Sequence, residues 1–283
     1  MRALEIDVPD ALLVKWVDWF APAVQPFLAD AELASAIDDH AGDLDLSDEL
    51  QGTYHFYDVP SELRYVWLTE AQFGALPRAR RAALVRAQRD HGREVVPSVR
   101  SWEAAIGRDV REQADGHRFV WWPSLVAGHE ERVLTDFIED GRRPSRHHEV
   151  PEAVWDSAAD KVPGARPLAG TFAPTSGPNC FGAVMGAAGV AGASSQWVVR
   201  EPFEEWLAST TRPRGDDKEP GTVLVWRSPD GLVQHAAVTL GDGWVFHKPS
   251  QGWMSPYKVL TIAECKASSR AIGRRLERHV IVE

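Results

Sequence analysis

Three residues of this chain, Cys180, His235 and His247, have the types and spacing that suit covalent acyl transfer. Cys180 ends the loop sequence 177–180 and opens a run of small residues, 183–189, which predicts a helix that begins at the cysteine. A cysteine in the first turn of a helix lies beside unpaired backbone N–H groups, and the helix dipole favours its thiolate. The segment therefore predicts a nucleophile.

The two histidines lie at opposite ends of a predicted β-hairpin. Apolar segments at 235–240 and 244–247 read as strands, and Gly241-Asp242-Gly243 between them is a turn sequence that accepts positive φ angles. Because a hairpin brings its two ends together, we expect His235 and His247 to be neighbours. A thiolate, a base and a group that orients the base are what thioester chemistry requires.

Composition limits the classes of partner. The chain has 283 residues, of which 44% are hydrophobic and 25% charged, and its net charge is -10. An acidic balance argues against binding to nucleic acid or to a membrane surface, because both usually require a basic footprint. The arginines between 78 and 100 are interpreted as one solvated helix face. No apolar run approaches the roughly 20 residues that cross a bilayer.

Cysteine content and the amino terminus indicate a compartment. Cys180 and Cys265 are too few for a disulfide framework in a chain of this length. A bridge between them would consume the predicted nucleophile, so the functional interpretation favours a reducing compartment. The first ten residues lack the pattern of a signal peptide. We therefore expect a cytoplasmic protein in which Cys265 is structural.

The stretch 142–178 is rich in proline and glycine and predicts a boundary between two domains, 1–150 and 151–283. In the first domain, helices are predicted over 10–40 and 78–91, and strands over 53–59 and 63–68. In the second, a helix from Cys180 and another near 202–209 precede strands at 222–226, 235–240, 244–247, 257–260 and 279–282. Thr261 and Glu264 have the spacing of a capping box.

This order of elements predicts an α+β fold. A nucleophile-bearing helix packs on an antiparallel sheet that carries the two histidines. A mixed, mostly helical domain of unknown role precedes it, and that amino-terminal region is a candidate surface for a protein partner.

At Cys180, at 220–226 and at the 235–247 hairpin, the pattern resembles the NlpC-type cell-wall peptidases, a branch of the papain-like cysteine hydrolases. Members of that family show a cysteine opening a helix, a strand, and a hairpin that begins with histidine. The resemblance covers about residues 165–265. It implies a papain-like fold in which Cys180 is the nucleophile, His235 the general base and acid, and His247 the residue that orients His235.

The resemblance also implies the reaction. We expect a cysteine-dependent amide or peptide hydrolase that acts through a thioacyl-enzyme on a small peptide or peptide-like substrate, without a metal or organic cofactor. Phe181 stands where the family has a small polar residue and would shape the adjacent subsite. Trp244 and Trp253 flank the predicted cleft and are candidate substrate-binding residues. Lys248 and Ser250 are read either as contacts for a substrate carboxylate or as a solvated turn.

Two other functions fit the same residues. An acyltransferase would use the same triad and pass the acyl group to an amine or alcohol instead of water. A catalytically inactive papain-like module would keep the fold and bind a protein through the amino-terminal region. A zinc site on Cys180, His235 and His247 is disfavoured because no acidic residue nearby has ligand spacing. His147-His148-Glu149 is interpreted as a solvated loop.

Overall fold

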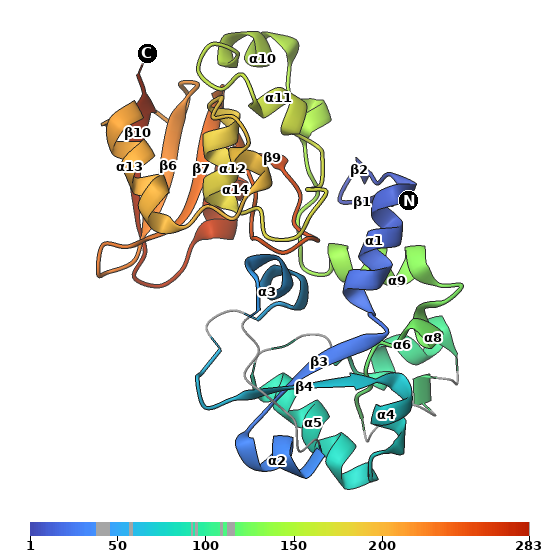
Figure 1. Cartoon of the computed structure of the whole chain (residues 1–283). Coiled ribbons are helices and arrows are strands. Elements are labelled where there is room, and N and C mark those ends of the chain that lie inside the picture. Colours follow the sequence, from blue (N-terminus) through green and yellow to red (C-terminus); the bar gives the residue numbers. More distant parts are fainter. Residues whose placement is uncertain are drawn as a thin grey trace. The chain divides into compact units, whose positions relative to one another are not determined.

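The chain divides into two compact units, one of which is formed by two separate stretches of sequence (Figure 1). One unit contains Met1–Pro9 and Ile138–Glu283, and the other contains Asp10–Phe137. The division thus lies at 137/138, whereas the sequence placed it at 150/151, and the first nine residues belong with the carboxy-terminal unit. The computed structural model describes residues 1–37, 46–56, 59–91, 93, 96–107, 110–111 and 117–282.

The carboxy-terminal unit is built on a six-stranded sheet in the order β5-β10-β6-β7-β8-β9, in which every neighbouring pair is antiparallel. Its strands are β5 (Thr211–Pro213), β6 (Thr222–Arg227), β7 (Val233–Gly241), β8 (Trp244–His247), β9 (Lys258–Thr261) and β10 (Arg275–Ile281). The predicted α+β class is confirmed. The short β5 was not among the strands predicted from the sequence.

Helices accompany this sheet. They are α10 (Glu152–Ala158), α11 (Ala165–Leu168), α12 (Cys180–Ala187), α13 (Arg200–Thr210) and α14 (Ile262–Ser269), with the 3-10 turns η1 (His147–Glu149) and η2 (Ala193–Ser195). Thr261 caps α14, and Glu264 returns the hydrogen bond to the Thr261 N–H, so the predicted capping box is confirmed. A small hairpin of β1 (Arg2–Ala3) and β2 (Ile6–Asp7) also belongs to this unit.

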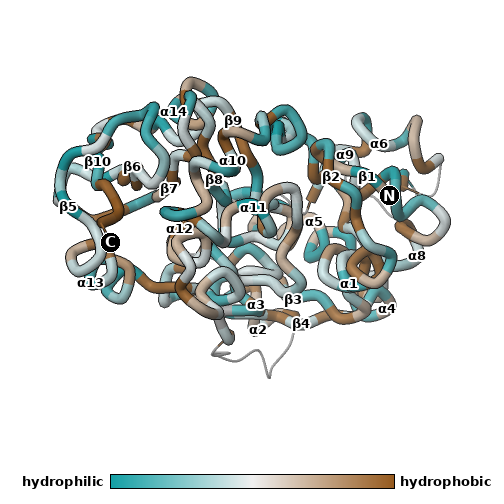
Figure 2. The backbone as a smooth tube through the Cα atoms, turned by 90° about the horizontal axis from the view of Figure 1, so that it is seen from above, coloured by the Kyte–Doolittle hydropathy of each residue, from teal (hydrophilic) through white to brown (hydrophobic). Residues whose placement is uncertain are grey.

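Strand alternation gives the sheet two apolar faces. Val223 and Val225 of β6 belong to the core cluster that contains α10, α12 and α13, whereas Leu224 and Trp226 belong to the cluster that contains Cys265 of α14. Figure 2 shows apolar stretches along the inner strands. Because both faces are covered, β6 reads as one continuous apolar run rather than as an alternation.

The other unit is mostly helical around a two-stranded antiparallel sheet. Its elements are α1 (Asp10–Phe20), β3 (Val24–Ala29), α2 (Ala31–Ile37), α3 (Asp48–Tyr54), β4 (Arg64–Thr69), α4 (Glu70–Ala75), α5 (Arg78–Asp90), α6 (Val99–Ile106), α8 (Pro123–Val126) and α9 (Glu130–Glu139), of which α9 runs across the division. None of the helices within the described ranges is long and apolar enough to cross a membrane.

Two predictions for this unit were wrong. Residues 24–29 form strand β3 instead of continuing a helix. Pro26 is tolerated there because each strand of a two-stranded sheet is an edge, and Gln88 of α5 bonds both the N–H and the carbonyl of Leu28. The strand predicted over 53–59 is absent at 53–54, which end helix α3, while residues 57–58 lie outside the described residues.

The partner of β4 also differs from the prediction. Strand β4 pairs with β3 rather than with the strand predicted over 53–59. Helix α3 forms instead because Ser47 caps its start and His55, at φ 59°, closes its end with an N–H bonded to the Gln51 carbonyl.

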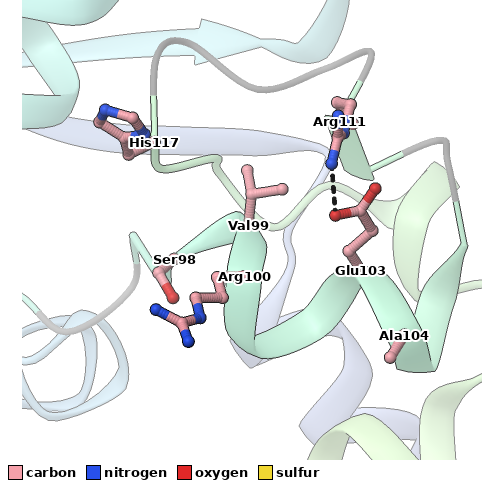
Figure 3. Close-up of a pocket in the computed structure, with 7 residues that line it drawn as sticks. All are labelled: Ser98, Val99, Arg100, Glu103, Ala104, Arg111 and His117. Carbon is pink, nitrogen blue, oxygen red and sulfur yellow. Dashed lines mark hydrogen bonds and ion pairs between the residues drawn. The ribbon is translucent and has the colours of Figure 1, made fainter.

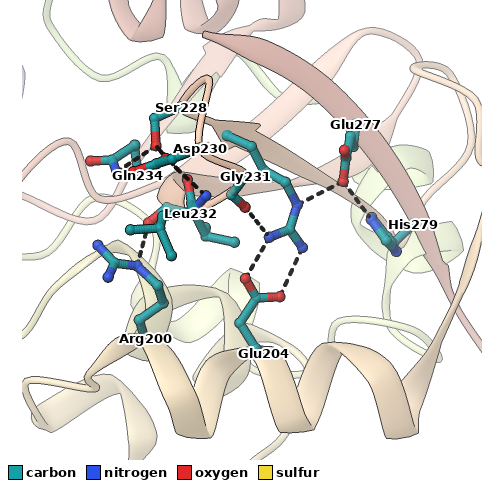
Figure 4. A network of polar contacts seen from close by, with 11 residues as sticks. Arg200, Glu204, Ser228, Asp230, Gly231, Leu232, Gln234, Glu277 and His279 are labelled. Carbon is teal, nitrogen blue, oxygen red and sulfur yellow. Dashed lines mark hydrogen bonds and ion pairs between the residues drawn. The ribbon is translucent and has the colours of Figure 1, made fainter.

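An ion-pair network joins three elements of the carboxy-terminal unit (Figure 4). The guanidinium of Arg227 on β6 binds both carboxylate oxygens of Glu204 on α13, at 2.5 and 2.8 Å, and its Nε donates to Glu277 on β10 at 2.7 Å. Its Nη1 also donates to the Gly231 carbonyl at 2.9 Å. The side chain of Arg227 is only 15% exposed, whereas Glu204 and Glu277 are 33% and 38% exposed, so the cation is shielded from solvent and its partners are half-buried.

We predict that Arg227→Met lowers the free energy of unfolding by about 2–3 kcal/mol, because it leaves two carboxylates without their shared cation. Arg166→Met is the matched control, since Arg166 pairs with Glu152 and both side chains are more than half exposed. The control should change stability by no more than about 0.5 kcal/mol. Urea unfolding followed by tryptophan fluorescence measures both, and equal effects would refute the structural role of the network.

Candidate active site

Cys180 is the first residue of α12, as the sequence predicted, and Asn179 fixes this position. The Asn179 side chain accepts a hydrogen bond from the Gly182 N–H at 3.0 Å and donates one to the Val198 carbonyl at 2.7 Å. One side chain therefore caps the helix and ties its start to the chain near α13. The cap explains why an asparagine precedes the cysteine.

Gly182 lets the helix start approach its neighbour closely. A Cβ added at Gly182 would lie 2.4 Å from the Ala193 carbonyl oxygen and 2.8 Å from that of Gln196. Both are backbone atoms that cannot rotate away. In the segment Asn179–Gly182, Asn179 thus caps the helix, Cys180 opens it, and Gly182 permits a close contact with the neighbouring loop.

The thiol of Cys180 is buried, with 9% of the residue exposed. Backbone N–H groups of Ala236, Phe181 and Cys180 itself lie within hydrogen-bonding range of the sulfur. Burial nevertheless raises the pKa of the thiol to about 11, against the opposing effect of those N–H groups. The effect of desolvation on the thiol pKa is therefore larger than the effect of the N–H groups at the helix start, and the resting sulfur is a neutral thiol near pH 7.

His235 and His247 are neighbours, as the hairpin predicted. The Nδ1 atom of His247 lies 3.4 Å from Nε2 of His235, and the two rings are 5.7 Å apart in an edge-on arrangement. Burial, with a smaller contribution from Arg274, lowers the pKa of His235 to about 4. Burial, His235 and Lys258 lower the pKa of His247 well below its ordinary value. Both imidazoles are neutral near pH 7.

The connection between the strands sets this pairing. Gly241, Asp242 and Gly243 all have positive φ, at 98°, 49° and 83°. The Gly-Asp-Gly sequence is therefore required by the backbone of the turn. At the other end of β7, the register with β6 shifts so that Gln234 has no partner, and such a bulge redirects the neighbouring side chain, here His235.

Cys180 and His235 lie on different faces of the sheet. Cys180 belongs to the core cluster that contains Ala236 of β7, whereas His235 pairs with Trp226, a member of the cluster on the opposite face. The His235 ring lies 5.3 Å from that of Trp226. Within the described part of the chain, no hydrogen bond joins the Cys180 thiol to the His235 imidazole. The structure therefore brings Cys180 to the residue next to His235, not to its ring.

The predicted substrate-binding residues lie mostly inside the fold. Phe181 is buried and stacks on Phe203 of α13, with ring centroids 4.5 Å apart. Trp253 is only 2% exposed. Trp244 is half-buried and packs against the cluster that contains Cys180. Of the three, Trp244 is the residue that solvent reaches.

Lys248 is fully buried, at 0% exposed, which its sequence does not predict. Its Nζ donates to the carbonyls of Ser250, Gly252 and Ser255 at 2.8, 3.1 and 2.6 Å. The ammonium also lies 5.7 Å from the centre of the Tyr257 ring. Burial lowers the pKa of Lys248 to about 7, and the charge of Cys180 opposes that shift. The interpretation of Lys248 as part of a solvated turn is therefore wrong.

Other candidate features are weaker. No group of three or more His, Cys, Asp or Glu residues in the described ranges is arranged to hold a metal ion. Both cysteines are free. A pocket of about 880 Å³ lies at α6 in the other unit. Its lining, shown in Figure 3, is Ser98, Val99, Arg100, Glu103, Ala104, Arg111 and His117.

Comparison of the chain with protein-family models, with curated proteins and with solved structures found no match. The functional argument therefore depends on the residues of the site and on their geometry.

We predict that Asn179→Ala lowers the free energy of unfolding by about 1–2 kcal/mol, because both the helix cap and the bond to Val198 are lost. Asn179→Asp is the matched comparison, since its carboxylate still accepts from the Gly182 N–H but cannot donate to Val198. It should fall between the wild type and the alanine variant in urea unfolding. Equal stability of all three proteins would show that Asn179 does not hold the start of α12.

Proposed function

We propose that this chain is a papain-like cysteine hydrolase that cleaves an amide bond of a small peptide or peptide-like substrate through a thioacyl-enzyme. The observation that carries the proposal is the arrangement at β7. A helix-opening cysteine packs on Ala236, and the preceding residue, His235, is hydrogen-bonded to His247. Nucleophile, base and orienting group thus lie at or against neighbouring positions of β7 and β8, with the sulfur on one face of the sheet and the two imidazoles on the other.

The proposed chemistry balances with these groups alone. His247 holds Nε2 of His235, which leaves Nδ1 of His235 to accept the thiol proton. The sulfur attacks the substrate carbonyl, the C–N bond breaks, and His235 returns the proton to the leaving amine. Water, deprotonated by His235, then attacks the thioester, the C–S bond breaks, and His235 returns the proton to the Cys180 sulfur. The N–H groups of Cys180 and Phe181 at the helix start are donors for the oxyanion.

Substrate entry must rearrange the site before this chemistry. The thiol and both imidazoles are buried and neutral, and the thiol has no hydrogen bond to His235. His235 pairs with Trp226 of the cluster on the other face of the sheet from Cys180. We propose that substrate binding rearranges the bulge at Gln234 and turns the His235 ring to the sulfur, so that proton transfer accompanies attack instead of preceding it. Two free cysteines accord with the cytoplasmic location expected from the sequence.

The same burial favours a second candidate, a catalytically inactive papain-like module. In that case the closed site stabilises the fold, and the helical unit, residues 10–137, binds a protein partner. An acyltransferase uses the same thioester and differs only in the acceptor. Added amine would then divert the product without changing the rate at which the acyl-enzyme forms.

We predict that the protein releases amine from a panel of short peptide anilides, and that Cys180→Ala abolishes release because no thioester can form. His235→Ala should lower kcat/KM at least about 100-fold, since the general acid and base is removed. Cys265→Ala is the matched cysteine control and should keep full activity, because Cys265 lies in the cluster at α14. Activity that survives Cys180→Ala would contradict the proposed function.

A further inference from the structure

Lys248 lies on the same face of the sheet as Cys180. Phe246 of β8 belongs to the core cluster that contains Cys180, and Lys248, the first residue after β8, continues the alternation of the strand on the same side. Tyr257, whose ring lies beside the Lys248 ammonium, is a member of that cluster too. His247, one residue before Lys248, faces the opposite side of the sheet and pairs with Lys258 of β9.

The hydrogen bonds of Lys248 select its charged form. An ammonium has three protons to donate, and three carbonyl oxygens accept them. No carboxylate among the described residues pairs with this cation. A fully buried charge without a counter-ion is costly, so the surroundings favour a negative charge nearby.

The loop that Lys248 holds is tied to the start of α12. The carbonyls that bind its ammonium belong to residues 250–255, and within this loop the Gln251 carbonyl accepts from the Gly177 N–H at 3.3 Å. Gly177 is three residues before Cys180. The lysine and the cysteine are therefore held by one connected piece of backbone, and each acts on the charge of the other.

We propose that Lys248 supplies the positive charge that stabilises the ionised sulfur of Cys180. The inference rests on the proposed function only in that it concerns the same thiol. Lys248 acts through the electric field and not by touching a substrate, and it forms no bond. The other charged groups near the site face the histidines: Arg274 acts on His235, and Lys258 acts on His247.

The test is the rate at which iodoacetamide alkylates Cys180 between about pH 6 and pH 9, read by peptide mass spectrometry in the wild type and in Lys248→Met. Lys248 is charged below its pKa of about 7 and loses the charge above it. At about pH 6 the wild type should react about tenfold faster than the variant, which corresponds to about one pKa unit in the thiol. The ratio should approach one by about pH 9.

Lys258→Met is the matched control. Lys258 is also buried, donates to the Arg143 carbonyl at 2.8 Å, and has a pKa lowered to about 8 by burial. Its charge acts on His247 and Cys265, so the Cys180 profile should not change. In the wild type and in Lys248→Met, Cys265 labelling in the same digest reports any general loosening of the fold; in Lys258→Met it also reflects the lost charge beside Cys265.

The proposal would be overturned if the wild type and Lys248→Met were alkylated at the same rate at every pH. It would also be overturned if the wild type were faster by a factor that does not vary with pH, because a merely structural lysine gives a constant ratio of the two rates. If Lys248→Met does not fold, the wild type alone decides. The logarithm of its rate should rise with a slope below one near pH 7, where the lysine titrates, and a uniform unit slope would overturn the proposal. No outcome requires turnover, so failure of the proposed hydrolysis is detected separately.

Discussion

Burial of ionisable groups against strands β7 and β8 is the constraint on which the rest of this site depends. Cys180, His235, His247 and Lys248 are each at least nine-tenths buried. Desolvation shifts all four towards their neutral forms. Backbone N–H groups oppose this shift at Cys180, and three carbonyl oxygens accept the protons of the Lys248 ammonium. A reactive thiolate in this environment requires a compensating positive charge, either from an imidazolium or from the ammonium.

This constraint connects the local features of the fold. Asn179 and Gly182 place the cysteine at the edge of a tightly packed helix, and the bulge at Gln234 redirects the neighbouring histidine. The turn at 241–243 brings the second histidine back to the first. Each feature has a local sequence signature, which is why the helix start and the hairpin could be predicted from the chain alone.

Other parts could not be predicted because they depend on contacts between distant segments. Lys248 is followed by proline, serine and glycine, a composition that is typical of a solvated turn. Its burial depends on the three carbonyl oxygens that accept from its ammonium, and the sequence does not show these contacts. Likewise, an apolar spacing alone does not show which face of the sheet a residue occupies. Strand β3 was missed because a short apolar run fits a buried helix equally well, and its pairing with β4 decides the outcome.

The most direct test of the account is intact-mass analysis of the protein mixed with an activated ester of a short peptide and quenched in acid. The account predicts one added acyl group, located on Cys180 by digestion. The adduct should be absent from Cys180→Ala and should form much more slowly in His235→Ala. No adduct on Cys180, or an adduct that forms at the same rate without His235, would contradict the assignment of this cysteine and histidine as a catalytic pair.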